Sequence, residues 1–377
     1  MKTYKCVCGQ LIFFRNISCV NCKRQLGFLP DALVMSSLDA ESDGLWKPTR
    51  IPKVQTPLYR KCQNYWKESV CNWMVPKEES DPFCIACRLN ETIPDLSQPE
   101  NRALWAAAEG AKRGVVYSLL SLGLPVESKK AHGASGLAFR FLADVQNNDG
   151  TVSRTLTGHS DGTITLNIDE ADDIHRETVR RKMKEPYRTL LGHFRHEVGH
   201  YYWDRLVRGT DYLGPFRDLF GDERPDYARA LARYYETGAP VDWQASFISA
   251  YATSHPWEDW AETWAHFLHI IDTLEVANDF GLVGKRLLSA PDESDGRSWL
   301  STGRDDFDGV IRAWSELVVA LNSINRSMGI TDLYPFVLSP PVVGKLRFVH
   351  AVAYGDAPPD ASGNAVVPQP ASAAAKS

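Results

Sequence analysis

Two histidines and a glutamate with metal-binding potential lie together in the segment His196-Glu197-Val198-Gly199-His200. The surrounding residues, TLLGHFRHEVGHYYWDRLV, contain no proline and predict a helix. Positions i and i+4 of a helix lie about 40° apart, so both imidazoles can reach a single zinc ion. Glu197 would then lie beside the ion, where its carboxylate can accept a proton from a bound water. The spacing therefore predicts a metallohydrolase; histidines packed in a helix without metal are the alternative.

A helix predicted from Trp257 onward can supply the third protein ligand that a catalytic zinc needs. Glu258 and Glu262 are four positions apart and therefore lie on one face of this helix. We expect Glu258 to bind the zinc and Glu262 to accept a hydrogen bond from a ligand histidine. The reverse assignment, with Glu262 on the metal, is the alternative. Three further histidines are expected to be packed helix residues: His193, His266 and His269. A hydrogen-bond partner of the metal ligands is the alternative for His193.

All eight cysteines lie between positions 6 and 87, which is typical of zinc ribbons in a reducing compartment. The first group consists of Cys6 and Cys8, followed by Cys19 and Cys22. Two such short pairs place four thiolates on two tight turns and predict a tetrahedral zinc site. So short a segment cannot bury a core of its own, so metal binding and folding should be coupled. We assign residues 1–30 to a zinc ribbon.

A second cysteine group lies in residues 56–98. Its members are Cys62, Cys71, Cys84 and Cys87. The last two have the spacing of a tight metal-binding turn, and the group predicts a second structural zinc. Unligated cysteines packed among aromatic residues are the alternative. Residues 31–55 contain Ser, Asp and Pro without a hydrophobic period, and are predicted to be a linker between the two groups.

Residues 99–353 are predicted to form the catalytic domain. A helical pattern begins at Pro99, and the residues around Ser160-Asp161-Gly162 alternate as in a β-hairpin. A helix from about Glu177 is predicted to break at Pro186, ahead of the histidine-bearing helix. The Pro-, Ala- and Ser-rich residues 354–377 are predicted to be disordered.

The composition of the 377-residue chain, 44% hydrophobic and 24% charged, is that of a water-soluble globular protein with room for an enzyme-sized core. A net charge of −5 argues against general nucleic-acid binding by the whole molecule. The sequence contains no apolar run long enough to span a bilayer, and no secretory signal precedes Cys6. We therefore expect a cytoplasmic protein without membrane contact.

The chain resembles zinc-binding metallopeptidases that carry an N-terminal zinc ribbon. The resemblance covers nearly all of the chain except its tail. It is carried by the two cysteine groups and by the segments RLNETIPDL, TGHSDGTITLNIDEAD, GHFRHEVGHYYWDRL and HPWEDWAETWAHFLHIIDTL. An HExxH helix paired with a downstream helix of E-x-x-A-E type is similar to gluzincin peptidases, including those of the lethal-factor kind.

This resemblance implies that Glu258 binds zinc and that a tyrosine seven residues earlier, Tyr251, polarises the substrate carbonyl. A core or surface aromatic is the alternative for Tyr251. The implied reaction is hydrolysis of a peptide or protein by a zinc-activated water, with Glu197 as general base. In zincins an edge strand pairs with the substrate backbone, and GTITLNI, residues 162–168, is our candidate. His200 and Glu258 are 58 positions apart, so the intervening residues must fold away from the site.

The expected fold is α+β and mainly helical: a zincin-like metallopeptidase domain preceded by a small zinc-ribbon region. The expected cofactors are one catalytic and one or two structural zinc ions. The alternative function is a binding or adaptor protein whose HExxH domain is not a peptidase; a third possibility is an HExxH domain that holds zinc without peptide chemistry. The partner of the binding or adaptor protein, a protein or a nucleic acid, would dock on the basic first thirty residues, which carry Lys2, Lys5, Arg15, Lys23 and Arg24.

Overall fold

The computed structural model divides into two compact units. It describes residues 2–49, 57–146, 149, 151–153, 155–183, 185, 188–283, 304 and 306–357. Unit 1 is Met1–Tyr201 with Leu268–Pro335, and unit 2 is Tyr202–Phe267 with Phe336–Ser377. The predicted break at Pro186 and residues 358–377 of the predicted tail lie outside the described residues.

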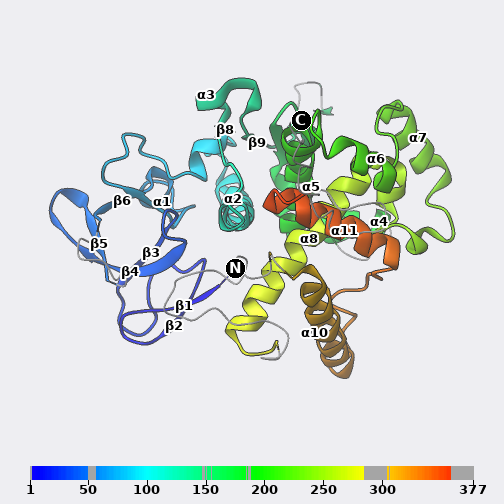
Figure 1. Ribbon diagram of the computed structural model, residues 1–377. Helices are drawn as coiled ribbons and strands as arrows, with labels where there is room; N and C mark the ends of the chain where they lie inside the picture. The colour runs from blue at the N-terminus through cyan, green and yellow to red at the C-terminus, as the bar shows by residue number, and fades with distance from the viewer. Residues whose placement is uncertain are drawn as a thin grey trace, which may run out of the picture. The chain divides into compact units, whose positions relative to one another are not determined.

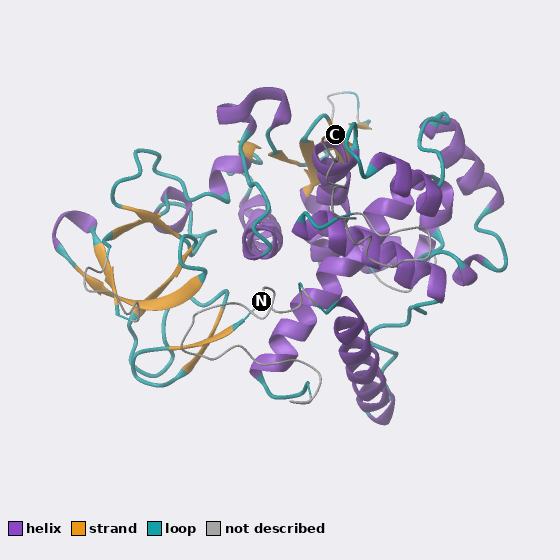
Figure 2. Cartoon of the chain, viewed as in Figure 1, coloured by secondary structure: helices purple, strands orange, loops and turns teal. Residues whose placement is uncertain are grey.

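Unit 1 begins with small antiparallel sheets. Strands β1 (Thr3–Lys5) and β2 (Leu11–Phe13) pair with each other. The next sheet has five strands in sequential order, β3 to β7. Strands β3 to β6 are labelled in Figure 1, and the strands are orange in Figure 2. These strands are β3 (Gln25–Leu29), β4 (Val34–Ala40), β5 (Trp46–Pro48), β6 (Tyr59–Lys61) and β7 (Met74–Pro76). A short helix, α1 (Gln63–Trp66), lies between β6 and β7 in sequence.

Residues 31–55 were expected to be a linker, but the structure places β4 and β5 there. The sequence of β4 resembles a linker because two of its buried positions carry serines, Ser36 and Ser37, which are completely buried in the structure. The Ser37 hydroxyl lies 2.6 Å from the Thr49 hydroxyl and accepts a hydrogen bond from the Val7 backbone N–H at 3.2 Å. Buried hydroxyls are tolerated when such partners exist. The described part of this segment therefore belongs to the sheet.

The second part of unit 1 combines a four-stranded sheet with helices. The sheet order is β12-β13-β9-β8. Its strands are β8 (Asn90–Thr92), β9 (Ala138–Leu142), β12 (Gly158–Ser160) and β13 (Thr163–Asn167), while β10 (Val145–Gln146) and β11 (Val152–Ser153) form a separate pair. The helices are α2 (Pro99–Ser121), α3 (Lys129–His132), α4 (Asp173–Met183), α5 (Leu190–Tyr202) and α10 (Phe307–Ser327). The predicted helix at Pro99 is confirmed.

The predicted hairpin is also confirmed, because β12 and β13 are antiparallel around Asp161 and Gly162. Both turn residues have positive φ, 47° and 73°, as a tight two-residue connection requires. The expectation that residues 162–168 form an edge strand is wrong. In the described sheet β13 pairs with β12 on one side and β9 on the other, so the edges are β12 and β8. β12 has three residues, too few for a clear alternating pattern.

Helix α5 packs on one face of this sheet. The Phe194 ring lies 5.6 Å from Phe139 and 6.3 Å from Phe141, centroid to centroid. Ile164 and Leu166 of β13 are also buried, at 0% and 1% exposure. Such alternation of buried apolar residues along β9 and β13 places one face of the sheet against the core. The histidine-bearing helix is thereby fixed on a rigid layer.

Unit 2 is helical. It contains α6 (Leu213–Phe220), α7 (Tyr227–Thr237), the 3₁₀ turn Tyr251–Ser254, the first half of α8 (Pro256–Asp279) and α11 (Pro340–Tyr354). Its core is aromatic: the Trp260 ring packs near Phe216, Phe220 and Phe348, with centroids about 6 Å apart. Helix α8 begins with Pro256, as predicted. Among the described helices, none combines the length and apolar character needed to cross a membrane. The α+β, mainly helical class is confirmed.

Candidate metal centres

His196 and His200 converge on one side of α5. Their Nε2 atoms lie 3.2 Å apart, and the rings meet at 81°. Two nitrogens at about 2.0–2.1 Å from a tetrahedral zinc would lie about 3.3 Å apart, so the pair fits this ion. Both side chains are buried, at 8% and 4% exposure. The predicted convergence of the two imidazoles is therefore present in the structure.

Glu258 completes a group of potential ligands with these histidines. One ligand atom from each of His196, His200 and Glu258 lies within 4.8 Å of the others. Glu258 is 1% exposed, whereas Glu262 is half-buried and is not in the group. Two imidazoles and one carboxylate form the donor set of a catalytic zinc site that keeps a position open for water or substrate. Glu197, beside His196, is 8% exposed.

Two residues of α5 next to the histidine pair, Arg195 and His193, make polar contacts with other elements. Arg195 lies 2.5 Å from Asp272 and 3.2 Å from the Nδ1 atom of His269. His193 forms an ion pair with Glu170. Burial would raise the pKa of Glu170, but the charge and hydrogen bond of His193, with Thr157 and Arg188, lower it to about 2. The structure thus places His193 and His269 in packed helix contacts, as expected.

His159 is a neighbour of the site that sequence reasoning missed. Its ring stacks on His200, 6.1 Å between centroids and 21° between planes. Its Nε2 atom accepts a hydrogen bond from the backbone N–H of Gly162 at 3.0 Å. The residue belongs to β12, whose short polar sequence gave no signal beyond its place beside the predicted turn. His159 therefore helps fix the ring plane of one candidate ligand.

Glu258 lies among residues of unit 2 that hold the start of α8. The next residue, Asp259, forms a buried ion pair with Lys345 of α11 at 2.6 Å, and Lys345 also donates to the Ser246 carbonyl at 2.8 Å. Burial raises the pKa of Asp259 to about 7, despite the opposing charge of Lys345. The hydroxyl of Tyr227 donates to Glu258 Oε1. These contacts fix the helix turn that carries the carboxylate.

Tyr251 lies in the 3₁₀ turn ahead of α8. It is half-buried, and its ring packs at 5.7 Å from Tyr234 of α7. Burial raises the pKa of Tyr251 strongly, and the negative charge of Glu258 raises it further. Its hydroxyl is therefore protonated and able to donate a hydrogen bond. His266, the remaining predicted packed histidine, is buried with its ring 4.4 Å from Phe336.

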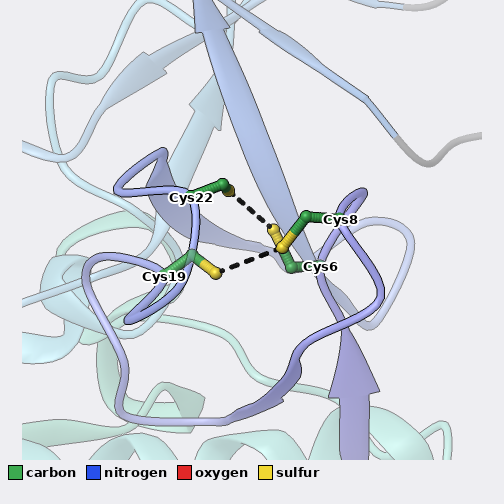
Figure 3. A group of neighbouring side chains, drawn as sticks. All are labelled: Cys6, Cys8, Cys19 and Cys22. Carbon is green, nitrogen blue, oxygen red and sulfur yellow. Dashed lines mark hydrogen bonds between the residues drawn. The ribbon is translucent and has the colours of Figure 1, made fainter.

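The first cysteine group forms a compact set of four sulfurs (Figure 3). Cys6 Sγ lies 3.5 Å from Cys22 Sγ, and Cys8 Sγ lies 3.6 Å from Cys19 Sγ. Four sulfurs at about 2.3 Å from a tetrahedral zinc would be about 3.8 Å apart, so the spacing fits a zinc ribbon. The two turns that carry the pairs face each other in the close-up.

The second cysteine group is more deeply buried. Cys71 Sγ lies 3.9 Å from Cys84 Sγ and 3.7 Å from Cys87 Sγ, and all four residues, with Cys62, are buried. The backbone N–H of Cys84 donates to Cys62 Sγ at 3.3 Å. This geometry favours a four-thiolate metal site over unligated cysteines. None of the eight cysteines is in a disulfide.

Comparison with known proteins agrees with these two kinds of site. Residues 101–352 match the family described as "Putative zinc-binding metallo-peptidase", and residues 3–98 match a zinc-ribbon domain. Uncharacterized proteins of Mycobacterium bovis and Mycobacterium tuberculosis are 40% identical over 361 residues, which cover 95% of this chain and 97% of theirs. No solved structure matches the chain significantly.

The helical domain with its His-His-Glu group and the two groups of four cysteines define a zinc-binding protein of metallopeptidase type. The chain belongs to the zinc-binding metallo-peptidase family whose model it matches, and it carries a zinc-ribbon domain at its N-terminal side.

Proposed function

We propose that the protein is a zinc-dependent peptidase with His196, His200 and Glu258 as metal ligands. The observation that carries this proposal is the convergence of one ligand atom from each of the three residues within 4.8 Å. The group lies in a chain whose family is described by zinc binding and peptidase activity. The zincin-like character of the domain is part of this proposal.

Zinc bound there would supply a Lewis acid that activates water for attack and polarises the scissile carbonyl. The Glu197 carboxylate would accept the proton of the attacking water and pass it to the leaving amine. Its place beside His196 on α5 keeps it next to the ligand pair. His159 and Arg195 would hold the orientation of this helix and of the His200 ring.

Tyr251 would donate a hydrogen bond to the oxyanion that develops on the carbonyl. Its hydroxyl carries a proton at neutral pH and can therefore act as the donor. The substrate is a peptide or a protein. The described sheet edge at β12 is a position where an extended peptide could add a strand, in place of the interior strand β13.

The two cysteine groups would each hold a structural zinc, which gives three ions per chain. Eight cysteines that would bind zinc as thiolates and form no disulfide are typical of a reducing compartment, and we infer a cytoplasmic protein for this reason. Partner docking on the ribbon is less favoured than sequence reasoning suggested. Arg24 forms an ion pair with Asp39, and the Arg15 guanidinium lies against Gly110 of α2.

Metal content together with hydrolysis tests this proposal. Elemental analysis should find three zinc ions in the wild type and two in His196→Ala/His200→Ala and in Glu258→Ala. Glu262→Ala is the matched control on the same helix and should keep all three. Glu197→Gln should keep three ions but lose cleavage of a peptide library. Unchanged metal content in both ligand variants would leave zinc on the cysteines alone and remove the basis for hydrolysis.

A further inference from the structure

Helix α7 lies in the long stretch of sequence between His200 and Glu258, yet its first residue contacts the candidate site. The Tyr227 hydroxyl donates to Oε1 of Glu258 at 2.5 Å. The acceptor is 1% exposed, whereas Tyr227 itself is 37% exposed. The insertion was expected to fold away from the site. Instead it brings a phenol hydroxyl to the buried carboxylate.

The Tyr227 ring is held by the residues on either side of Pro256, at the start of α8. It meets the His255 ring edge-on, at 5.3 Å and 80°, and the Trp257 ring at 5.8 Å and 77°. The Nδ1 atom of His255 accepts a hydrogen bond from the Trp257 backbone N–H at 3.1 Å. The hydroxyl is therefore aimed at Glu258 by the same turn that carries Glu258.

The start of α7 is itself defined. The Asp226 side chain accepts a hydrogen bond from the Arg229 backbone N–H at 3.0 Å, which caps the helix and places Tyr227 at its first position. Just ahead of the cap, the Pro225 carbonyl lies 3.3 Å from His255 Nε2. The chain entering α7 is thus tied to the chain entering α8. A rigid connection of this kind suits a hydrogen bond that must be held in one geometry.

We propose that Tyr227 is a positioning residue for the third metal ligand, an inference that rests on the proposed function. A carboxylate has two oxygens, and a hydrogen bond at Oε1 would restrict rotation of the group and so hold it in one orientation toward the metal. Hydrogen-bond partners of ligands orient them and are commonly needed for full metal affinity. This role differs from that of Tyr251, which is proposed to act on the substrate carbonyl.

Tyr212 supplies a matched comparison within unit 2. Its hydroxyl also makes a hydrogen bond, but to the backbone carbonyl of Asp356 rather than to a candidate ligand. Tyr212→Phe and Tyr227→Phe therefore each remove one hydrogen-bonded hydroxyl from a tyrosine. If the Tyr227 hydroxyl has only a structural role, the two substitutions should have the same effect on the metal site. If it positions Glu258, only Tyr227→Phe should change the metal site.

Cobalt binding by the full chain tests the inference without relying on activity. A chelator first removes the zinc ion of the His196/His200/Glu258 group, the one that His196→Ala/His200→Ala should lack, from the wild type and from both phenylalanine variants. Co²⁺ is then titrated back. Tyr227→Phe should bind Co²⁺ about 10–100-fold more weakly than the wild type. The spectrum of the cobalt-treated His196→Ala/His200→Ala variant is subtracted from each spectrum. The remaining visible bands of Tyr227→Phe should be shifted relative to those of the wild type. Tyr212→Phe should match the wild type in both respects.

Peptide cleavage provides the second measurement. Excess zinc should restore most of the activity of Tyr227→Phe, because only its metal affinity is impaired, but should not restore Tyr251→Phe. Wild-type cobalt affinity and spectrum in Tyr227→Phe would overturn the inference while leaving the proposed function intact. A wild type that takes up no cobalt beyond the double-histidine variant would overturn the proposed function and this inference together.

Discussion

Arg195 and Asp272 form a buried ion pair within unit 1, and Arg195 directly precedes the candidate ligand His196. The Nη2 and Oδ2 atoms are 2.5 Å apart, and the two side chains are 4% and 5% exposed. The Ser118 hydroxyl lies 2.8 and 2.7 Å from the two Asp272 oxygens. The pair thus connects α2, α5 and the second half of α8, and it fixes the rotation of α5 about its axis.

Asp272→Asn is expected to destabilise the protein by about 3–5 kcal/mol, because it leaves the Arg195 guanidinium buried without its counter-charge. Thermal or urea unfolding measures this loss. Asp279→Asn on the same helix is the control. Asp279 is exposed and accepts a hydrogen bond from the Thr3 backbone N–H at 2.6 Å, so its loss should cost no more than about 1 kcal/mol. Equal losses in both variants would contradict a special role for the buried pair.

The ionised Glu170 side chain should make the free energy of unfolding decrease at acid pH. Its pKa is lowered from 4.5 to about 2, so the folded state prefers the ionised form. That preference contributes fully above the unfolded pKa of about 4.3 and is lost as pH falls toward 2. Glu170→Gln should therefore lower stability by about 2–3 kcal/mol at pH 7, with a difference from wild type that shrinks below pH 4.5.

Urea unfolding of both proteins at matched pH values, each with chelator present, measures this difference. Metal loss at low pH affects both proteins and cancels in the comparison. Glu177→Gln is the control. Its pKa is also lowered to about 2, by hydrogen bonds to Arg180 and Arg181, but solvent screens these exposed pairs on α4, so its loss should change stability little at any pH. A constant difference between Glu170→Gln and wild type from pH 7 to pH 3 would contradict the prediction.

The approach of His196 to His200 could be predicted from sequence because helical periodicity alone determines which side chains share a face. These two candidate ligands need only α5 to form. The cysteine pairs were predictable for the same reason: Cys6 and Cys8 lie on one turn, and Cys84 and Cys87 lie on another. Local spacing thus gave most of the candidate site.

The missed features depend on contacts between residues distant in sequence. Tyr227 reaches Glu258 across thirty-one positions, and no periodic pattern links the two. His159 stacks on His200 because β12 pairs with β13 beside α5, which a three-residue strand does not reveal. Ser36 and Ser37 of β4 suggested a linker because the groups that bond to the buried Ser37 hydroxyl, Val7 N–H and the Thr49 hydroxyl, come together only when the sheet forms. Tertiary structure decided these cases.

The second cysteine group should be sensitive to a buried charge from α2. Arg113 donates to the Val70 carbonyl at 2.6 Å, just ahead of Cys71, and lies 3.7 Å from Glu109. Zinc with four thiolates carries a net charge of −2, so a buried guanidinium nearby stabilises the loaded site. Arg113→Met should release zinc from this group about tenfold more readily to a competing chelator.

Lys345→Met tests the ion pair behind Glu258. Both partners are buried, with side chains 6% and 0% exposed, so removing the ammonium leaves the Asp259 carboxylate without its counter-charge. The expected destabilisation is about 3–5 kcal/mol at pH 8. Burial holds the pKa of Asp259 at about 7 even beside Lys345, and loss of the ammonium should raise it further, so the variant should bind a proton there and lose less stability at pH 6.

Denaturant unfolding at pH 6 and pH 8 measures the effect, and Lys345→Met/Asp259→Asn separates its causes. Asparagine carries no charge at either pH, so the double variant should recover part of the lost stability at pH 8 and show no extra loss between pH 6 and pH 8. Lys345→Met with the same deficit at both pH values would show that packing of the lysine stem, rather than neutralisation of Asp259, is its contribution to the fold.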